Sequence, residues 1–309
     1  MPSPNDLDHL SLLLQRTVPD IGPVVGLEHV AEGYGATTLR ALGGLCIRIP
    51  HSAHLALKQN RTATALHRLA PLLPVPTPVP LWTLPVGYPF ETGAIGYQWI
   101  DGEQPDPETS PPSLAEQVGR FLATLHGIDG ETLDTFDGRV PGPADVAAER
   151  DQVMGVALPW LWERQSAGVM DWIERWWASF RAEREAARYE LRLVHGDFWH
   201  GNLLADASQE RLTGVIDWEQ IALDDQAQDL ATLLHGGTAF SHAVLATYRA
   251  AGGTVDAATI ARRDWLWGYR EFTGIALALE FGDEAEALDG MHKLQQGALR
   301  HLFITGSEP

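Results

Sequence analysis

The chain has 309 residues, of which 45% are apolar and 20% are charged. These proportions are typical of a globular protein with a large buried core. The formal net charge of −19 argues against nonspecific binding to nucleic acid or to an anionic membrane surface. No apolar run approaches the ~20 residues that span a bilayer, and the first residues lack the pattern of a secretory signal. Cys46 is the single cysteine, which excludes an internal disulfide and predicts a cytoplasmic location.

The charges are unevenly distributed along the chain. No Asp or Glu occurs between Gly33 and Phe90, whereas five basic side chains lie there: Arg40, Arg48, Lys58, Arg61 and Arg68. This region therefore suits a polyanion such as a nucleotide, and the acidic remainder favours a cationic small molecule as partner. The alternative is that the acidic surface serves solubility alone.

Short strands are predicted over residues 1–100. β-rich segments occur at residues 24–30, 37–41 and 45–49, and the last two flank a glycine turn. Apolar side chains at helical spacing predict a helix over residues 53–69. The proline-rich stretch 71–80 predicts a stiff, extended connector, and residues 94–100 form the last strand-like stretch.

Beyond residue 101 the pattern is mainly helical. Helices are predicted near residues 113–127, 143–153, 169–190, 226–235, 240–250, 258–281 and 284–303. A compact strand-rich stretch over residues 193–221 lies between the third and the fourth of them. A β-rich first part and a helical second part predict an α+β fold, with the boundary between two lobes near residue 100.

Residues 193–204 contain the pattern H-G-D-x-x-x-x-N, and Asp217 follows within the sequence I-D-W-E. A short strand after Asn202 and a returning strand before Asp217 predict a hairpin. With its turn centred between Ser208 and Arg211, Asn202 and Asp217 would lie opposite each other, and Asp197 would be close to both.

This arrangement would bring two oxygen donors and one free carboxylate together. Mg²⁺ suits such a site, because it takes few protein ligands and leaves room for phosphate oxygens. Phosphoryl transfer needs a residue that accepts a proton from the attacking hydroxyl, and metal ions that neutralise the phosphate oxygens. The spacing of D-x-x-x-x-N and a later Asp also matches the catalytic loop and metal-binding Asp of protein kinases.

These residues resemble the aminoglycoside phosphotransferase and choline-kinase-like family, whose members share the protein-kinase fold. Four motifs carry the resemblance: His195-Gly-Asp197 with Asn202, Ile216-Asp-Trp-Glu219, Asp229-Leu-Ala231, and the L-x-x-L-H pattern that ends at His126. The resemblance implies a bilobal fold, with a small β-rich nucleotide-binding lobe at residues 1–100 and a larger helical lobe at residues 101–309. The second lobe would carry the catalytic loop and the acceptor site.

The resemblance also implies a role for each matching residue. Asp197 would be the catalytic base, and Asn202 and Asp217 would bind Mg²⁺. His195 and Asp229 would support the loop. ATP or GTP would be the co-substrate, contacted by Arg48, Gly33, Gly35, Thr37, Gln98, Trp99 and Ile100. The implied reaction transfers the γ-phosphoryl group to a hydroxyl of a small molecule, such as an aminoglycoside, a macrolide or an amino alcohol.

Four features depart from the family pattern. The glycine turn at residues 33–38 lacks a third glycine, and the family's Gly-Asp-Pro is here Asp224-Asp225-Gln226. The other two concern the lysine of the third strand and its partner. Arg48 shares a strand face with Cys46, where the family has a lysine, and Thr62 occupies the position of the helix glutamate that pairs with that lysine. We expect Gln59, one turn earlier, to accept a hydrogen bond from Arg48. These departures keep open an alternative, a pseudokinase-like protein that binds a nucleotide or ligand with little turnover.

Other enzyme classes fit less well. Neither lysine follows a glycine, as a P-loop requires, and no third glycine completes a dinucleotide-binding fingerprint. His195, Asp197 and His200 would make a metal-hydrolase cluster only with a further ligand at suitable spacing, which the sequence does not offer.

Overall fold

The computed structural model describes residues 4–18, 24, 26–33, 35–87, 90–106, 108–129, 132 and 140–296. The chain forms two compact units. Unit 1 comprises Met1–Val140, His195–Ile221 and His235–Gly253, and unit 2 comprises Pro141–Val194, Ala222–Leu234 and Thr254–Pro309. The predicted boundary between two lobes at residue 100 stays a prediction. The compact units are defined by packing, whereas the predicted lobes are defined by the ligands they would bind. Within the described ranges, no helix is long and apolar enough to cross a membrane.

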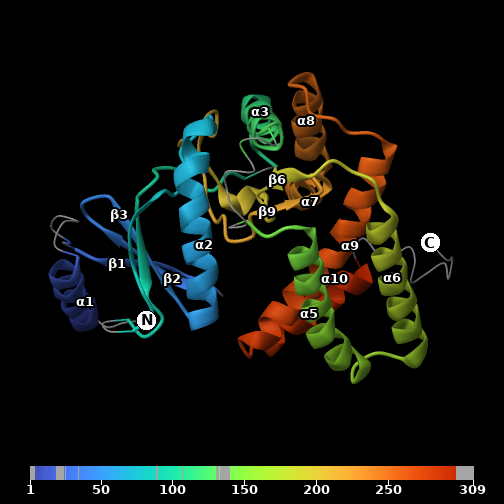
Figure 1. Ribbon diagram of the computed structural model, residues 1–309, viewed down its shortest axis with the longest axis horizontal. Helices are drawn as coiled ribbons and strands as arrows, with labels where there is room; N and C mark the ends of the chain where they lie inside the picture. Colours follow the sequence, from blue (N-terminus) through green and yellow to red (C-terminus); the bar gives the residue numbers. More distant parts are fainter. Residues whose placement is uncertain are drawn as a thin grey trace. The chain divides into compact units, whose positions relative to one another are not determined.

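Unit 1 contains a five-stranded antiparallel sheet in the order β1-β2-β3-β5-β4. Figure 1 labels β1, β2 and β3 of this sheet. Its strands are β1 (Glu28–Glu32), β2 (Ala36–Ala41), β3 (Leu45–Pro50), β4 (Pro80–Leu84) and β5 (Ala94–Gln98). The predicted strands at residues 37–41, 45–49 and 94–100 are confirmed to within two residues. The predicted strand at residues 24–30 begins later, because Gly26 has a φ of 61° and turns the chain just before β1.

One face of this sheet packs against α1 (Pro4–Thr17), a helix that was not among the predicted elements. Leu14 of α1 is completely buried in the same core as Leu39 and Ile47. The sequence does contain the signal for this helix, since Leu7, Leu10 and Leu14 recur at helical spacing.

The opposite face of the sheet carries α2 (Ala53–Leu69), whose bounds match the prediction. Ser52 caps α2 by accepting a hydrogen bond from the Leu55 amide. Cys46 packs against Ala63 of α2, so Cys46 and Arg48 lie on the α2 side of β3, as strand alternation predicts. Burial raises the pKa of the Cys46 thiol to about 11.

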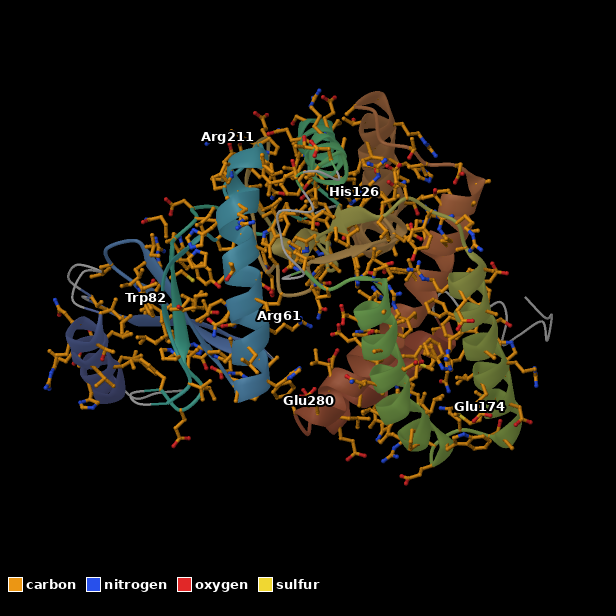
Figure 2. All side chains as sticks on the ribbon, viewed as in Figure 1. Arg61, Trp82, His126, Glu174, Arg211 and Glu280 are labelled. Carbon is orange, nitrogen blue, oxygen red and sulfur yellow. The ribbon has the colours of Figure 1, made fainter. Side chains whose placement is uncertain are left out.

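The rest of unit 1 is built on two packed helices, α3 (Pro112–His126) and α8 (Gly237–Ala250). They approach closely at Gly119, where an added Cβ atom would lie 2.6 Å from the Val244 carbonyl oxygen. At the end of α3, Nδ1 of His126 hydrogen bonds with the Tyr248 hydroxyl at 2.9 Å, in the region labelled in Figure 2. Of the two helices, α3 also contacts the loop that carries Asp197, through Phe121 and Phe198.

Unit 2 contains α5 (Pro143–Trp162), α6 (Ala167–Ala186), α7 (Ala227–Thr232), α9 (Ala257–Glu280) and α10 (Glu284–Gln296), with the short strands β6 (Arg192–Val194) and β9 (Ala222–Asp224). Its core is aromatic: Trp176 stacks on Phe272 at 5.4 Å, and Phe180 stacks on Tyr269 at 5.5 Å. The predicted α+β class is confirmed, with one antiparallel sheet in the first part of the chain and a mainly helical remainder.

Helix bounds in unit 2 differ from the prediction in three helices. α6 ends at Ala186, four residues before the predicted end at residue 190, and α7 ends at Thr232, three residues before the predicted end at residue 235. The predicted end of α5 at residue 153 is wrong, because the helix continues to Trp162. Gly155 and Pro159 are residues that commonly interrupt a helix, so the sequence alone suggests a break there. Ala157 and Leu161 are completely buried, and this burial outweighs the local preference of the glycine and the proline. The predicted end of the last helix at residue 303 lies outside the described residues.

Candidate active site

The loop that carries Asp197 begins directly after β6 and ends in a 3₁₀ turn at His200–Asn202, followed by β7 (Leu203–Ala205). The loop rests on buried aromatic rings. Phe121 of α3 stacks on Phe198 at 5.6 Å, with the planes 10° apart, and meets the edge of Trp218 at 6.2 Å. All three side chains are almost completely buried. The helix that carries the L-x-x-L-H pattern therefore packs against the loop and helps to fix its position.

His195 joins this loop to the next strand. One ring nitrogen, Nε2, donates to the Ile216 carbonyl oxygen at 2.9 Å, and Nδ1 accepts from the Asp197 amide at 3.3 Å. This pattern defines the tautomer with hydrogen on Nε2. Gly196 has a φ of 87°, and an added Cβ atom would lie 2.1 Å from the Gln220 carbonyl oxygen, so only glycine fits between His195 and Asp197. These contacts are those expected of a residue that pins the loop.

Asp197 and Asn202 are in direct contact. Nδ2 of Asn202 donates to Oδ2 of Asp197 at 3.0 Å and to the Asp197 carbonyl oxygen at 2.8 Å. The Asn202 amide nitrogen is thereby committed to Asp197, which leaves the Asn202 side-chain oxygen as the donor atom for a cation. Asn202 is almost fully buried, so this orientation is fixed by its surroundings.

Asp217 lies one position away from the place that the hairpin prediction gave it. Leu203 pairs with Val215, and the Asn202 carbonyl oxygen accepts from the Ile216 amide at 2.9 Å. Asn202 therefore faces Ile216, and the prediction that it faces Asp217 is wrong. The turn is centred one residue earlier than predicted, and a bulge in β8 (Leu212–Val215) recovers only part of the shift. Asp217 follows with a φ of 62°, a backbone conformation unusual for a residue other than glycine.

Arg48 pairs with two carboxylates from the segment after β8. Its NH1 lies 3.5 Å from Oδ1 of Asp217, and its NH2 lies 3.0 Å from Oε1 of Glu219. Burial by itself would lower the pKa of Arg48, but Asp217 and Glu219 together raise it above its ordinary value. Arg48 is therefore a permanent cation beside Asp217.

The prediction that Gln59 accepts a hydrogen bond from Arg48 is wrong, because Gln59 bonds to Glu219 instead. Its Nε2 donates to Oε1 of Glu219 at 2.9 Å, the same oxygen that receives Arg48. Thr62 is bonded to its own helix through the Lys58 carbonyl oxygen at 3.1 Å. Neither Gln59 nor Thr62 of α2 therefore bonds to Arg48, and the carboxylate beside Arg48 comes from Glu219. Sequence reasoning missed Glu219, although it lies within the quoted I-D-W-E motif.

The predicted nucleotide residues of the first hairpin lie beside this cluster. The Gly33 amide donates to the Ala36 carbonyl oxygen at 3.1 Å, and the Gly35 carbonyl oxygen accepts from the His51 amide at 3.1 Å. An added Cβ atom on Gly35 would lie 3.4 Å from Oε2 of Glu219. The Thr37 hydroxyl donates to Oε1 of Glu32 at 2.9 Å, so Glu32 would compete with a phosphate for this hydroxyl.

Gln98, Trp99 and Ile100 continue from β5. The Gln98 side chain and the Trp99 amide both donate to the Gly44 carbonyl oxygen, at 2.9 and 2.6 Å. The Arg40 guanidinium lies over the Trp99 ring at 4.3 Å. Ile100 packs against Gly214 of β8, where an added Cβ atom would lie 2.6 Å from its methyl carbon. Their predicted contact with the nucleotide base stays a prediction.

Asp229 lies in unit 2, in the first turn of α7, and is completely buried. Its predicted role as a support of the catalytic loop stays a prediction. Close to it in sequence lie two further acids that are completely buried, Asp224 and Asp225. Asp224 accepts from Arg150 at 3.0 Å and from Arg184 at 2.7 Å.

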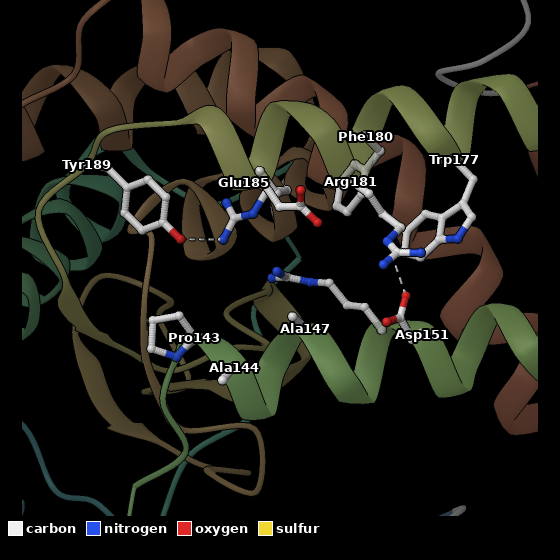
Figure 3. Close-up of a pocket in the computed structure, with 11 residues that line it drawn as sticks. Pro143, Ala144, Ala147, Asp151, Trp177, Phe180, Arg181, Glu185 and Tyr189 are labelled. Carbon is white, nitrogen blue, oxygen red and sulfur yellow. Dashed lines mark hydrogen bonds and ion pairs between the residues drawn. The ribbon is translucent and has the colours of Figure 1, made fainter.

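Asp225 accepts from Arg184 at 2.9 Å and from Arg262 at 2.6 Å, so the pair of acids joins α5, α6 and α9. A pocket of about 270 Å³ lies between α5 and α6 beside this network (Figure 3). Tyr189 lines one end of it, and Asp151 and Arg181 face each other across the other end at 3.6 Å. We define Arg150, Arg184, Arg262, Asp224 and Asp225 as the arginine–aspartate network.

The predicted metal ligands offer one amide oxygen, on Asn202, and the carboxylate of Asp217. This donor set fits Mg²⁺, which binds through one or two carboxylates and keeps several water molecules or phosphate oxygens. Among the residues that the structure describes, no three His, Cys, Asp or Glu side chains form a metal-binding group. The alternative cluster of His195, Asp197 and His200 is therefore not found.

Comparisons with known proteins show the family and the fold of the chain. A model of the phosphotransferase enzyme family matches residues 27–266. Viomycin phosphotransferase of Streptomyces vinaceus is 28% identical over 194 residues, and the match covers 60% of this chain. The chain spans 63% of that relative's length. The GDP and kanamycin complex of APH(2")-IIia is similar in fold, with a TM-score of 0.78, 21% identity and coverage of 93% and 97% of the two chains. A macrolide 2'-phosphotransferase type I has a TM-score of 0.69, 22% identity and coverage of 95% and 98%.

Proposed function

Because the chain belongs to the phosphotransferase enzyme family, we propose that it transfers the γ-phosphoryl group of ATP or GTP to a hydroxyl of a small molecule. The observation that carries this proposal is the direct contact of Asp197 with Asn202, at the end of a hairpin that leads to Asp217 and its ion pair with Arg48. A carboxylate, an amide oxygen, a second carboxylate and a fixed cation are the parts that phosphoryl transfer needs.

Asp197 is the proposed base. The hydrogen bond from Asn202 occupies its Oδ2, and its other carboxylate oxygen would accept the proton of the attacking hydroxyl. His195 is unsuited to this task, because both ring nitrogens are engaged in holding the loop. We propose that His195 and the buried Asp229 have supporting roles.

Asn202 and Asp217 are the proposed Mg²⁺ ligands. When bound, Mg²⁺ supplies positive charge that neutralises the β- and γ-oxygens of the nucleotide. The cluster of Arg48, Asp217 and Glu219 has one guanidinium and two carboxylates, so it carries an excess of negative charge when both acids are ionised. That excess favours the binding of a divalent cation beside Arg48.

The nucleotide would contact unit 1. Arg48 is the proposed phosphate ligand, helped by the turn of Gly33 and Gly35 and by Thr37. Backbone groups near Gln98, Trp99 and Ile100 would meet the base. A similar solved structure holds GDP, which supports a purine nucleotide without deciding between ATP and GTP here.

For the acceptor we propose a hydroxyl-bearing antibiotic or a similar metabolite, in line with the viomycin, aminoglycoside and macrolide phosphotransferases that resemble this chain. The net charge of −19 favours a cationic acceptor. Use of a nucleoside triphosphate agrees with the predicted cytoplasmic location, which stays a prediction.

The test is release of ADP or GDP in the presence of Mg²⁺ and a panel containing viomycin, kanamycin, gentamicin and macrolides. Asp197→Asn keeps an oxygen that can accept from Asn202 but removes the base, so we expect turnover to fall by about 10²–10⁴-fold. The matched control is Asp206→Asn, which changes a carboxylate in the turn of the same hairpin and should retain turnover.

Two results would decide against this proposal. If the unmodified chain binds neither Mg-ADP nor Mg-GDP, a nucleotide is not its co-substrate and the proposal is wrong. Nucleotide binding with no turnover that depends on Asp197, across the whole panel, would favour the pseudokinase-like alternative.

A further inference from the structure

The arginine on β3 has lost the partner that a kinase-like fold provides from the adjacent helix, since Thr62 and Gln59 are not acids. We propose that Glu219 has taken over this task, and that the three residues Gln59, Glu219 and Arg48 form a relay that positions the Arg48 guanidinium for nucleotide phosphate. Glu219 is a positioning residue in this account, because it acts through Arg48. The inference rests on the proposed function for its ligand, the Mg-nucleotide.

The contacts of Glu219 support a built-in role. Its Oε1 receives two donors, NH2 of Arg48 at 3.0 Å and Nε2 of Gln59 at 2.9 Å. The Glu219 side chain is 15% exposed and Gln59 is 2% exposed, so both contacts are shielded from water. A charge-assisted hydrogen bond in such surroundings fixes geometry more firmly than an exposed pair does.

The orientation of Arg48 follows from this anchor. With NH2 held by Glu219, NH1 lies on the Asp217 side at the longer distance of 3.5 Å. Arginine suits this arrangement, because its planar fork can bond to one carboxylate and still present another N–H group to an anion. A lysine could also bond to both groups, but its three N–H groups rotate about one nitrogen and fix the geometry less firmly.

Two buried polar atoms mark the relay as incomplete. Nε of Arg48 and Oε1 of Gln59 are buried and have no hydrogen-bond partner within the described part of the chain. A donor and an acceptor left unpaired in one cluster are costly in a core, but they are common where a site takes a ligand or ordered water. The third side of the relay is Gly35, against which Oε2 of Glu219 lies, so the predicted phosphate turn and the relay share one surface.

The test measures the dissociation constant of Mg-ADP and Mg-GDP by calorimetry, which needs no knowledge of the acceptor. For Glu219→Gln, which removes the charge but keeps the size, we expect binding to weaken by about 10- to 100-fold. Glu219→Asp should weaken it less. In Arg48→Met, adding Glu219→Gln should produce no further loss, because the effect passes through Arg48.

Exchange of the two partners gives the sharpest result. Gln59→Glu alone places two carboxylates together and should weaken nucleotide binding. Combined with Glu219→Gln it restores one acid and one amide, so the double variant should recover most of the affinity. The matched control is Thr64→Ala, an uncharged change at an exposed position of the same helix that removes a hydrogen bond to the Asn60 carbonyl oxygen at 3.2 Å and should leave affinity unchanged.

Far-UV circular dichroism and thermal unfolding of each variant separate loss of affinity from loss of fold. Unchanged or tighter binding in folded Glu219→Gln would overturn the inference, since a tighter complex would mean that Glu219 competes with phosphate for Arg48. Failure of the exchange to recover affinity would also contradict the relay. If the unmodified chain binds neither nucleotide, the proposed function itself fails, which is a different outcome.

Discussion

Arginine–carboxylate pairs occur in both compact units, but the two sets differ in how fully their polar atoms are used. In unit 2, Asp224 and Asp225 are completely buried, and each accepts from two arginines. In unit 1, Asp217 has a side chain that is 41% exposed, and Nε of Arg48 is buried without a partner. The arginine–aspartate network of unit 2 therefore links helices within the core. The pair of Arg48 and Asp217 in unit 1 still has polar atoms that could bind a ligand.

The difference teaches how one chemistry can serve two purposes. A buried ion pair contributes little net stability compared with apolar packing, but removal of one partner leaves an uncompensated charge and is strongly destabilising. An exposed pair contributes little in either case. Mutations should therefore separate the two sets, with stability affected in unit 2 and ligand binding affected in unit 1.

The largest effect is expected for Asp225→Ala. It removes the buried partner of Arg262 and one of the two buried partners of Arg184, so the free energy of unfolding should fall by about 3–5 kcal/mol, measured by urea denaturation. The matched control is Asp151→Ala, whose pair with Arg181 is about half exposed and should contribute less than about 1 kcal/mol. Equal losses in the two variants would remove the contrast between the arginine–aspartate network and an exposed pair.

The next effect is expected for Asp217→Asn. Asparagine tolerates the left-handed backbone that Asp217 adopts, so the fold should remain. Binding of Mg-nucleotide should weaken by about 10- to 100-fold, because the carboxylate ligand is lost, while the free energy of unfolding changes by less than about 1 kcal/mol. Calorimetry with and without Mg²⁺ measures the first quantity. A large loss of stability with unchanged affinity would assign Asp217 to structure alone.

A smaller effect is expected for Tyr189→Phe. The Tyr189 hydroxyl donates to Oδ1 of Asp224 at 2.9 Å and accepts from Arg184 at 3.0 Å. Burial, together with Asp224, raises the pKa of Tyr189 to about 12, so it remains a neutral donor at neutral pH. Loss of the hydroxyl should lower the free energy of unfolding by about 1 kcal/mol. Thermal unfolding of the variant measures this, and a stabilised variant would contradict the view that every donor in the network is needed.

The smallest effect concerns Glu32, a largely exposed acid of unit 1. Hydrogen bonds, the largest from His29, hold the pKa of Glu32 below its ordinary value. Its contribution to stability is therefore present above the unfolded value of 4.5 and is lost as pH falls toward the folded value. Since its side chain is 55% exposed, we expect only a few tenths of a kcal/mol. Urea denaturation of Glu32→Gln at pH 7 and pH 4 measures it; a stability difference between the chains that grows toward pH 4 would show the opposite sign.

Local patterns predicted most of the fold and the centre of the site. The H-G-D-x-x-x-x-N spacing places Asp197 and Asn202 on one short loop, so their contact depends on few intervening residues. The bounds of α2 followed from apolar spacing, and the structure adds a local cap at Ser52. In both cases, the interactions that decide the structure lie within a few turns of chain.

The rest depends on contacts that a single sequence does not specify. Gln59 meets Glu219 across 160 positions, and nothing in the residues around Gln59 indicates this partner. The register of Asn202 against Ile216 is set by a bulge and by the turn centre, and a shift of one residue changes which side chains face each other. The length of α5 was decided by burial of Leu161, which no local preference reveals.

The buried thiol of Cys46 has a practical consequence. A thiolate is the form that reacts with maleimides, and with a pKa of about 11 this residue stays protonated and unreactive at neutral pH. Dyes would therefore attach only to cysteines introduced at exposed positions, such as Leu42 in unit 1 and Glu174 in unit 2. A dye at each such position would report separately on changes within its own unit when a nucleotide is added, with the native cysteine left in place.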